Sequence, residues 1–152
     1  GRSELVPNKK DLVIMIDYAH SPESLQSILS AVKSYTRGRV ISVFGCGGDR
    51  DKSKRPIMGK ISTSIADFSI ITSDNPRTEN PETIVKEIEE GAVKTKGKYI
   101  TIVDRTEAIK YAIDMATKND IIVLAGKGHE TYQEINGEKR HYDEREIIKE
   151  VI

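Results

Sequence analysis

The sequence contains no tryptophan, a single cysteine and only 5% aromatic residues in 152 positions. So few aromatic side chains argue against the stacking surfaces on which proteins hold single-stranded nucleic acid. The lone thiol, Cys46, cannot form an internal disulfide, which agrees with a reducing compartment. No apolar run approaches the ~20 residues of a membrane span, and the first residues lack the layout of a signal peptide. We therefore expect a soluble, cytoplasmic protein with neither a membrane nor a nucleic-acid partner.

An excess of charge of one sign is also missing, because 24 basic side chains balance 24 acidic ones. Because no net charge creates an electrostatic field around the whole molecule, any selectivity for charged ligands must come from local groups of side chains. The length suits one domain. Residues 1–10 have no apolar period and begin abruptly, without an initiator methionine. We expect them to be the remnant of an interdomain junction, and residues 11–152 to be one domain of a longer protein.

Short apolar, β-branched runs alternate with stretches of helical period. The predicted strands are 12–16, 40–44, 68–72, 99–103 and 121–124, and the predicted helices between them are 24–35, 57–65, 81–93 and 106–117. Strands without a polar face must be covered on both sides, which predicts an α/β, three-layer fold with an open, mostly parallel sheet. Asn136-Gly137 predicts a C-terminal antiparallel hairpin, and Asp143 the N-cap of a final helix.

In such sheets, ligands bind beyond the carboxyl ends of the strands. Four segments there are unusual: DYAHSPES (17–24), GCGGDRDKSKRP (45–56), SDNPRTENP (73–81) and GKGHETY (126–132). The glycines of the second segment, together with Arg50, Lys52, Lys54 and Arg55, outline an anion site. A strand-to-helix turn with a solvated basic cluster is the alternative. In the first segment, the Asp17 carboxylate could accept ribose hydroxyls.

The third segment contains a stiff loop, because Pro76 fixes its own φ and pushes Asn75 toward extended geometry. Asp74 and Arg77 should project from it. An Asx-type turn with a surface arginine is the simpler interpretation. Since Asn80-Pro81 already starts the next helix, the DNPR sequence is not needed for capping, which favours a ligand-binding role.

Several familiar motifs are incomplete. A dinucleotide fingerprint needs glycine at position 50, where arginine stands; a phosphate loop needs Ser or Thr after Lys127, where Gly128 stands; and a zincin helix needs a second histidine at position 133, which is Gln. The fourth segment is thus also compatible with a glycine turn bearing an exposed His-Glu pair. Flanking glycines would expose Cys46, but no histidine lies near it in sequence to generate a thiolate, so we expect an inert thiol.

Taken together and in this order, DYAHSPESL, FGCGGDRDKSKRPIMG, SDNPRTENP and AGKGHETYQ resemble the C-terminal domain of the Mur ligases, in particular of their MurE branch, the UDP-MurNAc-tripeptide synthetases. The resemblance implies a Rossmann-like last domain, with the N-terminal and central ATPase domains absent from this chain. It implies an ATP-dependent ligase of peptidoglycan synthesis that adds meso-diaminopimelate to UDP-MurNAc-L-Ala-D-Glu through an acyl phosphate. ATP and Mg²⁺ would be bound mainly by the central domain, so this chain alone should be inactive and should hold no metal.

The same resemblance implies the roles of individual residues. Arg77 would pair with the carboxylate at the D-configured end of diaminopimelate, which L-lysine lacks, and Arg50 with the other carboxylate. The diaminopimelate site would comprise Arg50, Asp74, Asn75, Pro76, Arg77, Gly126 and Glu130, and nucleotide contacts would come from Arg2, Asp17, Tyr18 and His20. These residues position substrates, and none is catalytic.

Three alternatives remain. A lysine-adding MurE or a folylpolyglutamate synthetase would have the same fold, and a free-standing module that binds an amino acid or a nucleotide would belong to another class. The combination of DNPR with GKGHE favours the diaminopimelate ligases among them.

Overall fold

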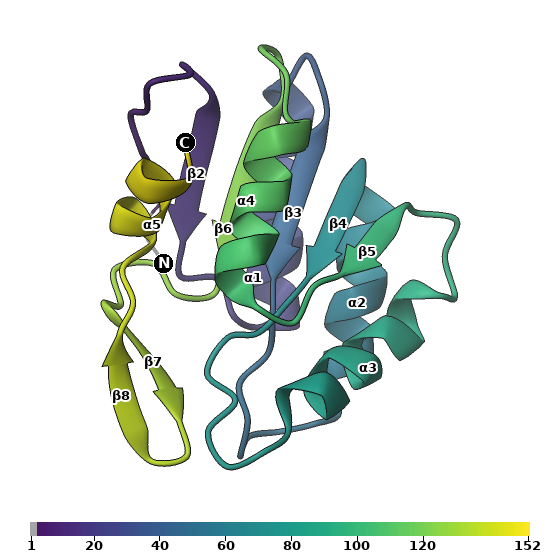
Figure 1. The fold of residues 1–152 in the computed structure, drawn as a ribbon. Coiled ribbons are helices and arrows are strands. Elements are labelled where there is room, and N and C mark those ends of the chain that lie inside the picture. The colour runs from purple at the N-terminus through teal and green to yellow at the C-terminus, as the bar shows by residue number, and fades with distance from the viewer. Residues whose placement is uncertain (1–2) are drawn as a thin grey trace.

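Six strands form one sheet between two layers of helices in the computed structural model, which describes residues 3–152 (Figure 1). The strand order is β1-β2-β6-β3-β4-β5, and only β1 runs antiparallel to its neighbour. The strands of the sheet are β1 (Glu4–Leu5), β2 (Val13–Asp17), β3 (Val40–Phe44), β4 (Phe68–Ile71), β5 (Tyr99–Thr101) and β6 (Ile121–Ala125). The helices are α1 (Pro22–Tyr35), α2 (Lys54–Ile65), α3 (Pro81–Ala92), α4 (Arg105–Met115) and α5 (Glu144–Val151).

Each face of the sheet has its own apolar core. Helices α1, α2 and α3 pack on one face around Phe44 and Val123, and α4 and α5 cover the other face around Ile41 and Leu124. Alternate residues of the central strands enter opposite cores, so β3 and β6 are buried along their whole length. Each large aliphatic side chain buried in this way stabilises the fold by ~1.5–3 kcal/mol. The predicted three-layer, mostly parallel α/β architecture is confirmed.

Side chains cap the N-termini of α1, α3, α4 and α5, whereas α2 has no side-chain cap. Asn80, Asp104 and Asp143 each accept a hydrogen bond from the backbone N–H two residues on, and Ser21 and Ser24 form a capping box at α1. The caps satisfy backbone donors that the first helical turn leaves free. They also fix where each loop ends, which limits the conformations of the loops between strand and helix.

The segment before residue 11 contains structure that the sequence pattern did not predict. Strand β1 pairs with β2, with Glu4 opposite Ile16, and the Val6 N–H donates to the Ile14 carbonyl at 2.8 Å. Two residues are too few to show a period of two, so this edge strand has no signature in sequence alone.

The predicted hairpin is present. It extends beyond the carboxyl edge of the sheet, at the lower left of Figure 1. Its strands are β7 (Tyr132–Ile135) and β8 (Glu138–His141). Asn136 and Gly137 both have positive φ, 50° and 79°, as a two-residue turn of type I′ requires. The Asn136 N–H donates to the Arg77 carbonyl at 2.8 Å, and the Arg77 N–H donates to the Glu134 carbonyl at 3.0 Å. The hairpin is therefore attached to the loop after β4.

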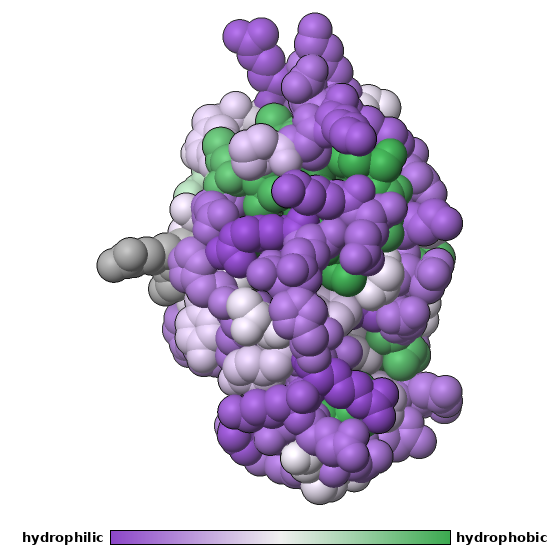
Figure 2. All heavy atoms as spheres, turned by 60° about the vertical axis from the view of Figure 1, so that its left-hand side comes forward, coloured by the Kyte–Doolittle hydropathy of each residue, from purple (hydrophilic) through white to green (hydrophobic). Residues whose placement is uncertain are grey.

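Hydrophilic residues cover most of the face shown in Figure 2, and hydrophobic ones form small patches, mainly in its upper half. Within residues 3–152, no helix has the length and apolar character needed to cross a bilayer.

Candidate functional site

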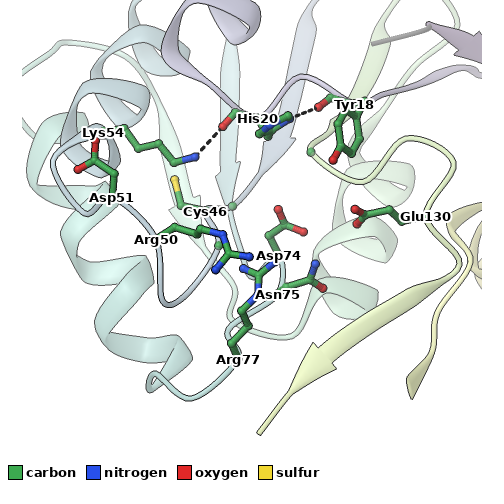
Figure 3. Close-up of a pocket in the computed structure, with 13 residues that line it drawn as sticks. Tyr18, His20, Cys46, Arg50, Asp51, Lys54, Asp74, Asn75, Arg77 and Glu130 are labelled. Carbon is green, nitrogen blue, oxygen red and sulfur yellow. Dashed lines mark hydrogen bonds between the residues drawn. The ribbon is translucent and has the colours of Figure 1, made fainter. Parts of the chain in front are cut away.

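The carboxyl ends of β2, β6, β3 and β4 are neighbours in the sheet, so the four unusual segments converge there. They enclose a cavity of about 380 Å³ (Figure 3). The order of the strands in the sheet differs from their order in the chain, because β6 is inserted between β2 and β3. The lining residues are Tyr18, His20, Gly45, Cys46, Gly47, Arg50, Asp51, Lys54, Asp74, Asn75, Arg77, Gly126 and Glu130.

Most of the residues predicted to bind ligands line this one cavity. The set contains six of the seven residues predicted for diaminopimelate, Arg50, Asp74, Asn75, Arg77, Gly126 and Glu130, and also Tyr18 and His20. Pro76 and Asp17 are not among the lining residues, and Arg2 lies outside the described part of the chain.

Asp17 and Pro76 do not line the cavity but are buried in contact with the segments beside it. The Asp17 carboxylate is buried and accepts hydrogen bonds from the Ala19 N–H at 2.8 Å and the Ser3 hydroxyl at 2.7 Å. Pro76 is buried under Gly48, where a Cβ would come within 1.9 Å of the Pro76 carbonyl oxygen. Only glycine allows this approach, which joins the loop after β3 to the loop after β4.

Arg77 is held in an unusual backbone conformation, with φ at 52°. Its Nε donates to Glu134 Oε1 at 2.9 Å, and its Nη1 donates to the Gly48 carbonyl at 2.9 Å. Among the described residues, Nη2 has no hydrogen-bond partner. The hairpin and the glycine loop thus orient a guanidinium group that keeps donors for a ligand, and Figure 3 shows it directed toward Arg50 and Asp74.

The basic cluster after β3 is only partly available to an anion. Arg50 is exposed at the cavity and donates to the Asp49 carbonyl at 2.9 Å, and Lys54 donates to the His20 carbonyl at 2.9 Å. Arg55, in contrast, is completely buried, and the prediction that it adds free positive charge is wrong.

Arg55 forms ion pairs with Glu79 and Glu87 and donates to the Gly47 carbonyl at 3.0 Å. Lys52 also lies near Glu79, at 3.6 Å. The acids from the loop after β4 and from α3 neutralise these two cations, so Arg55 shapes the glycine loop and leaves anion binding to other side chains.

Asp74 and Glu130 place two carboxylates on the cavity, where they surround one ammonium group of the protein. Asp74 is buried, and its Oδ1 has no hydrogen-bond partner among the described residues. Burial raises the pKa of Glu130 above its ordinary value, although the nearby Lys127 opposes that shift. Two partly desolvated acids favour binding of a cationic group.

Lys127 lies beside the cavity, next to Asp74 and Glu130, although its sequence context does not complete a phosphate loop. Its side chain is fully buried, and Nζ donates to Asn75 Oδ1 at 2.8 Å and to the Tyr132 carbonyl at 2.9 Å. A lysine between two glycines directly after a buried strand is a sequence signal that could have pointed to Lys127.

The interpretation of GKGHE as a plain turn with an exposed His-Glu pair is wrong for Glu130, because Glu130 lines the cavity. His129, in contrast, is exposed.

Arg105 connects the strands beneath the site. It is buried, and it donates to Glu144 Oε2 at 2.8 Å and to the carbonyls of Ser73 and Ala125 at 2.9 and 3.0 Å. These carbonyls end the segments that lead to Asp74 and Gly126. Arg105 therefore holds two binding loops together and ties them to α5.

Tyr18 and His20 form an aromatic pair at the edge of the cavity. Their ring centroids are 4.6 Å apart in an edge-to-face arrangement, and Tyr18 is 42% exposed. Such a surface can receive a planar base, which fits the prediction of nucleotide contacts.

Cys46 lies in the wall of the cavity, yet its thiol is buried, so the expectation that flanking glycines expose it is wrong. Desolvation raises the pKa of Cys46 to about 12, which keeps the thiol protonated. This agrees with the prediction of an inert thiol. No cluster of three or more His, Cys, Asp or Glu side chains suited to a metal ion occurs in residues 3–152.

Comparison with known proteins defines the class to which this fold and site belong. The model of the family described as "Mur ligase, glutamate ligase domain" matches residues 1–128, and the chain belongs to this family. The resemblance read from the four motifs is thereby confirmed.

Two sequence relatives share one enzyme name. The chain is 55% identical over its whole length to a protein of Caldanaerobacter subterraneus subsp. tengcongensis, and 51% identical to one of Clostridioides difficile. Both are named UDP-N-acetylmuramoyl-L-alanyl-D-glutamate--2,6-diaminopimelate ligase. The chain spans about a third of their length, 32% and 31%. A solved structure with the same name superposes with a TM-score of 0.92 at 41% identity, covering all of this chain and 31% of that one.

More distant structures share the fold only. One of them, the structure of E. coli FolC in complex with ADP, gives a TM-score of 0.60 at 20% identity over 83% of this chain.

Proposed function

We propose that this chain is the amino-acid-binding, C-terminal domain of an ATP-dependent ligase that adds meso-diaminopimelate to UDP-MurNAc-L-Ala-D-Glu during peptidoglycan precursor synthesis. The relatives that carry this name are about three times as long, which supports a whole protein with N-terminal and central domains before residue 11. A ligase of this kind, which consumes ATP, would act in the cytoplasm.

One observation carries the proposal: a single cavity presents the guanidinium groups of Arg50 and Arg77 together with the carboxylates of Asp74 and Glu130. Diaminopimelate has two carboxylates and two amines, so it needs both kinds of partner. Arg77, whose Nη2 has no partner among residues 3–152, suits the carboxylate of the D-configured end, and the exposed Arg50 suits the other carboxylate. Asp74 and Glu130 suit the ammonium of the D-configured end.

When the two carboxylates and the D-end ammonium of diaminopimelate are bound, the position of its other amine is fixed. That amine is the nucleophile that attacks an acyl phosphate on the nucleotide-linked peptide, and it must be neutral and directed away from the acids. The contribution of this domain is orientation of the amine, a form of catalysis that requires no reactive side chain here. Tyr18 and His20 at the edge of the cavity would contact the nucleotide from this side.

ATP supplies the phosphoryl group that activates the peptide carboxylate, and magnesium would neutralise the developing phosphate charge. The described residues contain no cluster suited to the metal. We therefore assign magnesium and the phosphates of ATP to the preceding domains.

L-lysine is the competing substrate, since a lysine-adding ligase would have the same fold. Lysine would leave Arg77 facing the cavity without a carboxylate. Arg77 would keep its ion pair with Glu134, but its remaining donors would lack a ligand acceptor in a partly desolvated site, which costs about 1 to 3 kcal/mol, or roughly 5- to 150-fold in affinity. This is the physical basis for choosing diaminopimelate.

The test is a titration of the chain with meso-diaminopimelate, with L-lysine and with ATP, followed by amide chemical shifts. Diaminopimelate should shift the resonances of Arg50, Asn75, Arg77 and Glu130, and lysine should need a much higher concentration to do so. In Arg77→Ala the diaminopimelate response should be lost, and in Arg77→Lys, which keeps the charge but not the planar fork, it should weaken.

Arg37→Ala is the matched control, because Arg37 is exposed at the opposite edge of the sheet, in the turn between α1 and β3. Equal responses to lysine and diaminopimelate would refute the substrate. In the complete ligase, Arg77→Ala should lower turnover with diaminopimelate by orders of magnitude and leave ATP binding nearly unchanged.

A further inference from the structure

Lys127 is a fully enclosed charge beside the cavity, and the orientation of diaminopimelate proposed above does not use it. Its side chain is 0% exposed, although lysine is rarely buried without a specific partner. Nζ lies 3.4 Å from Asp74 Oδ1 and 3.7 Å from Glu130 Oε1. Both acids of the proposed ammonium subsite, defined here as Asp74 and Glu130, therefore share one internal ammonium group.

The position of Nζ is fixed by neutral acceptors as well. Asn75 Oδ1 and the Tyr132 carbonyl accept its hydrogen bonds, and the rings of Tyr132 and Tyr142 lie 5.9 Å from it. These contacts come from the loop after β4 and from the hairpin side. Lys127 cannot move out of the subsite without breaking them, so its charge is a permanent part of the site.

The net charge of Asp74, Glu130 and Lys127 determines which ligand net charge the ammonium subsite favours. Two carboxylates and one ammonium leave the subsite with a net charge of −1, which one substrate ammonium neutralises. Without Lys127 the net charge would be −2, and a ligand with an excess positive charge would fit better. At neutral pH diaminopimelate has no net charge, whereas L-lysine carries +1.

We propose that Lys127 is a specificity-determining residue, whose buried ammonium group balances one of the two acids so that the site prefers a zwitterion with no net charge over a cationic amino acid. This inference rests on the proposed function, and it adds a second determinant to the carboxylate pairing of Arg77. It assigns to Lys127 no contact with the reacting atoms.

Two other charged groups act on Lys127. Arg105 from α4 opposes its charged form and Glu144 from α5 favours it, and the two form an ion pair with each other at 2.8 Å, so together they add no net charge to the subsite. Burial lowers the pKa of Lys127 below its ordinary value, while Asp74 and Glu130 favour its charged form. The ammonium group is thus stabilised mainly by the acids whose charge it balances.

The experiment measures the ratio of the dissociation constants for L-lysine and meso-diaminopimelate by calorimetric or NMR titration at pH 7. Lys127→Met keeps the length of the side chain and removes the charge, and it should lower this ratio about tenfold, toward lysine. Glu130→Gln makes the subsite less negative and should raise the ratio by a similar factor. The double variant restores the net charge and should return the ratio close to the wild-type value.

A merely structural role for Lys127 predicts a different pattern, in which both ligands weaken equally and the double variant is worse than either single one. That pattern, or a ratio unchanged in both single variants, would overturn the inference. Lys118→Met, at an exposed lysine after α4, is the control and should change nothing. If Lys127→Met does not fold, Lys127→Gln, which keeps a hydrogen-bond donor without the charge, should lower the ratio in the same way, and an unchanged ratio in that variant would overturn the inference.

A measurement without ligand separates this inference from the proposed function. In Lys127→Met, the pKa of the Glu130 carboxyl, followed by ¹³C chemical shift, should rise beyond its already raised wild-type value, because a neighbouring cation is lost. An unchanged Glu130 titration would refute the role of Lys127. A wild-type chain that binds lysine as tightly as diaminopimelate would instead refute the proposed function.

Discussion

Arg77 donates a hydrogen bond from Nε to Glu134 Oε1 over 2.9 Å, although the two residues are 57 positions apart in the chain. The backbone reinforces this contact, because the Arg77 N–H donates to the Glu134 carbonyl at 3.0 Å. The carboxylate of Glu134 fixes one side of the guanidinium group and leaves Nη2 for a ligand. The hairpin therefore takes part in the site without lining the cavity.

Glu134→Ala should release this orientation and weaken diaminopimelate binding three- to tenfold, which corresponds to about 0.5–1.5 kcal/mol for one partly exposed ionic hydrogen bond. Glu134→Gln keeps an oxygen acceptor and should retain most of the affinity. Calorimetric titration measures both. Glu138→Ala, at an exposed residue of the same hairpin, is the control, and tighter binding by Glu134→Ala would contradict the orienting role.

Arg105→Met should lower the free energy of unfolding by about 3–5 kcal/mol, because Glu144 would remain buried without a counter-ion. Urea unfolding at pH 7 measures the loss. Lys33→Met, which removes one partner of the exposed pair with Asp67, should cost no more than about 1 kcal/mol. Similar losses of unfolding free energy in the two variants would show that the burial of an ion pair does not determine how much its disruption costs.

Acid should destabilise the loops around the site through Glu79. Hydrogen bonds, above all from Arg55, lower the pKa of Glu79 to about 2 from an ordinary value of 4.5. A lowered pKa in the folded state stabilises the fold above about pH 4.5, and this contribution is lost as the pH falls toward 2.

Glu79→Gln should therefore be less stable than the wild-type chain at pH 7, and the difference should shrink between about pH 4.5 and 2. Urea unfolding at a series of pH values measures this. Glu90→Gln, at an exposed position on α3, should leave the wild-type pH profile unchanged. A constant difference between wild type and Glu79→Gln down to pH 2 would exclude the linkage.

Cys46 should react slowly with a thiol reagent in the folded chain at pH 8, because it is buried and its pKa is raised to about 12. In denaturant it should react at the rate of a free thiol. A colorimetric thiol assay with and without denaturant measures the ratio, and rapid labelling of the folded chain would show that the cavity wall opens.

Local patterns in the sequence were sufficient for the helices and for every strand except β1. Apolar runs such as 40–44, the caps at Asn80 and Asp143, and the Asn136-Gly137 turn all depend on neighbours within a few residues. The four segments that meet at the cavity could be picked out because parallel strands place their carboxyl ends at one edge. Strand β1 was missed because its two residues are defined by their pairing partner.

The roles of the charged residues could only be decided by the tertiary structure. Arg50 and Arg55 stand five positions apart in one basic run, yet the first is exposed at the cavity and the second is buried between Glu79 and Glu87. The sequence around Lys127 resembles an incomplete phosphate loop, and only the fold places the carboxylates of Asp74 and Glu130 at 3.4 and 3.7 Å from its ammonium group. The sequence by itself determined which elements form and where the site lies, since both follow from local periodicity and strand direction. Which charges pair and which stay available for a ligand depends on distances between residues remote in the chain, and folding alone sets those distances.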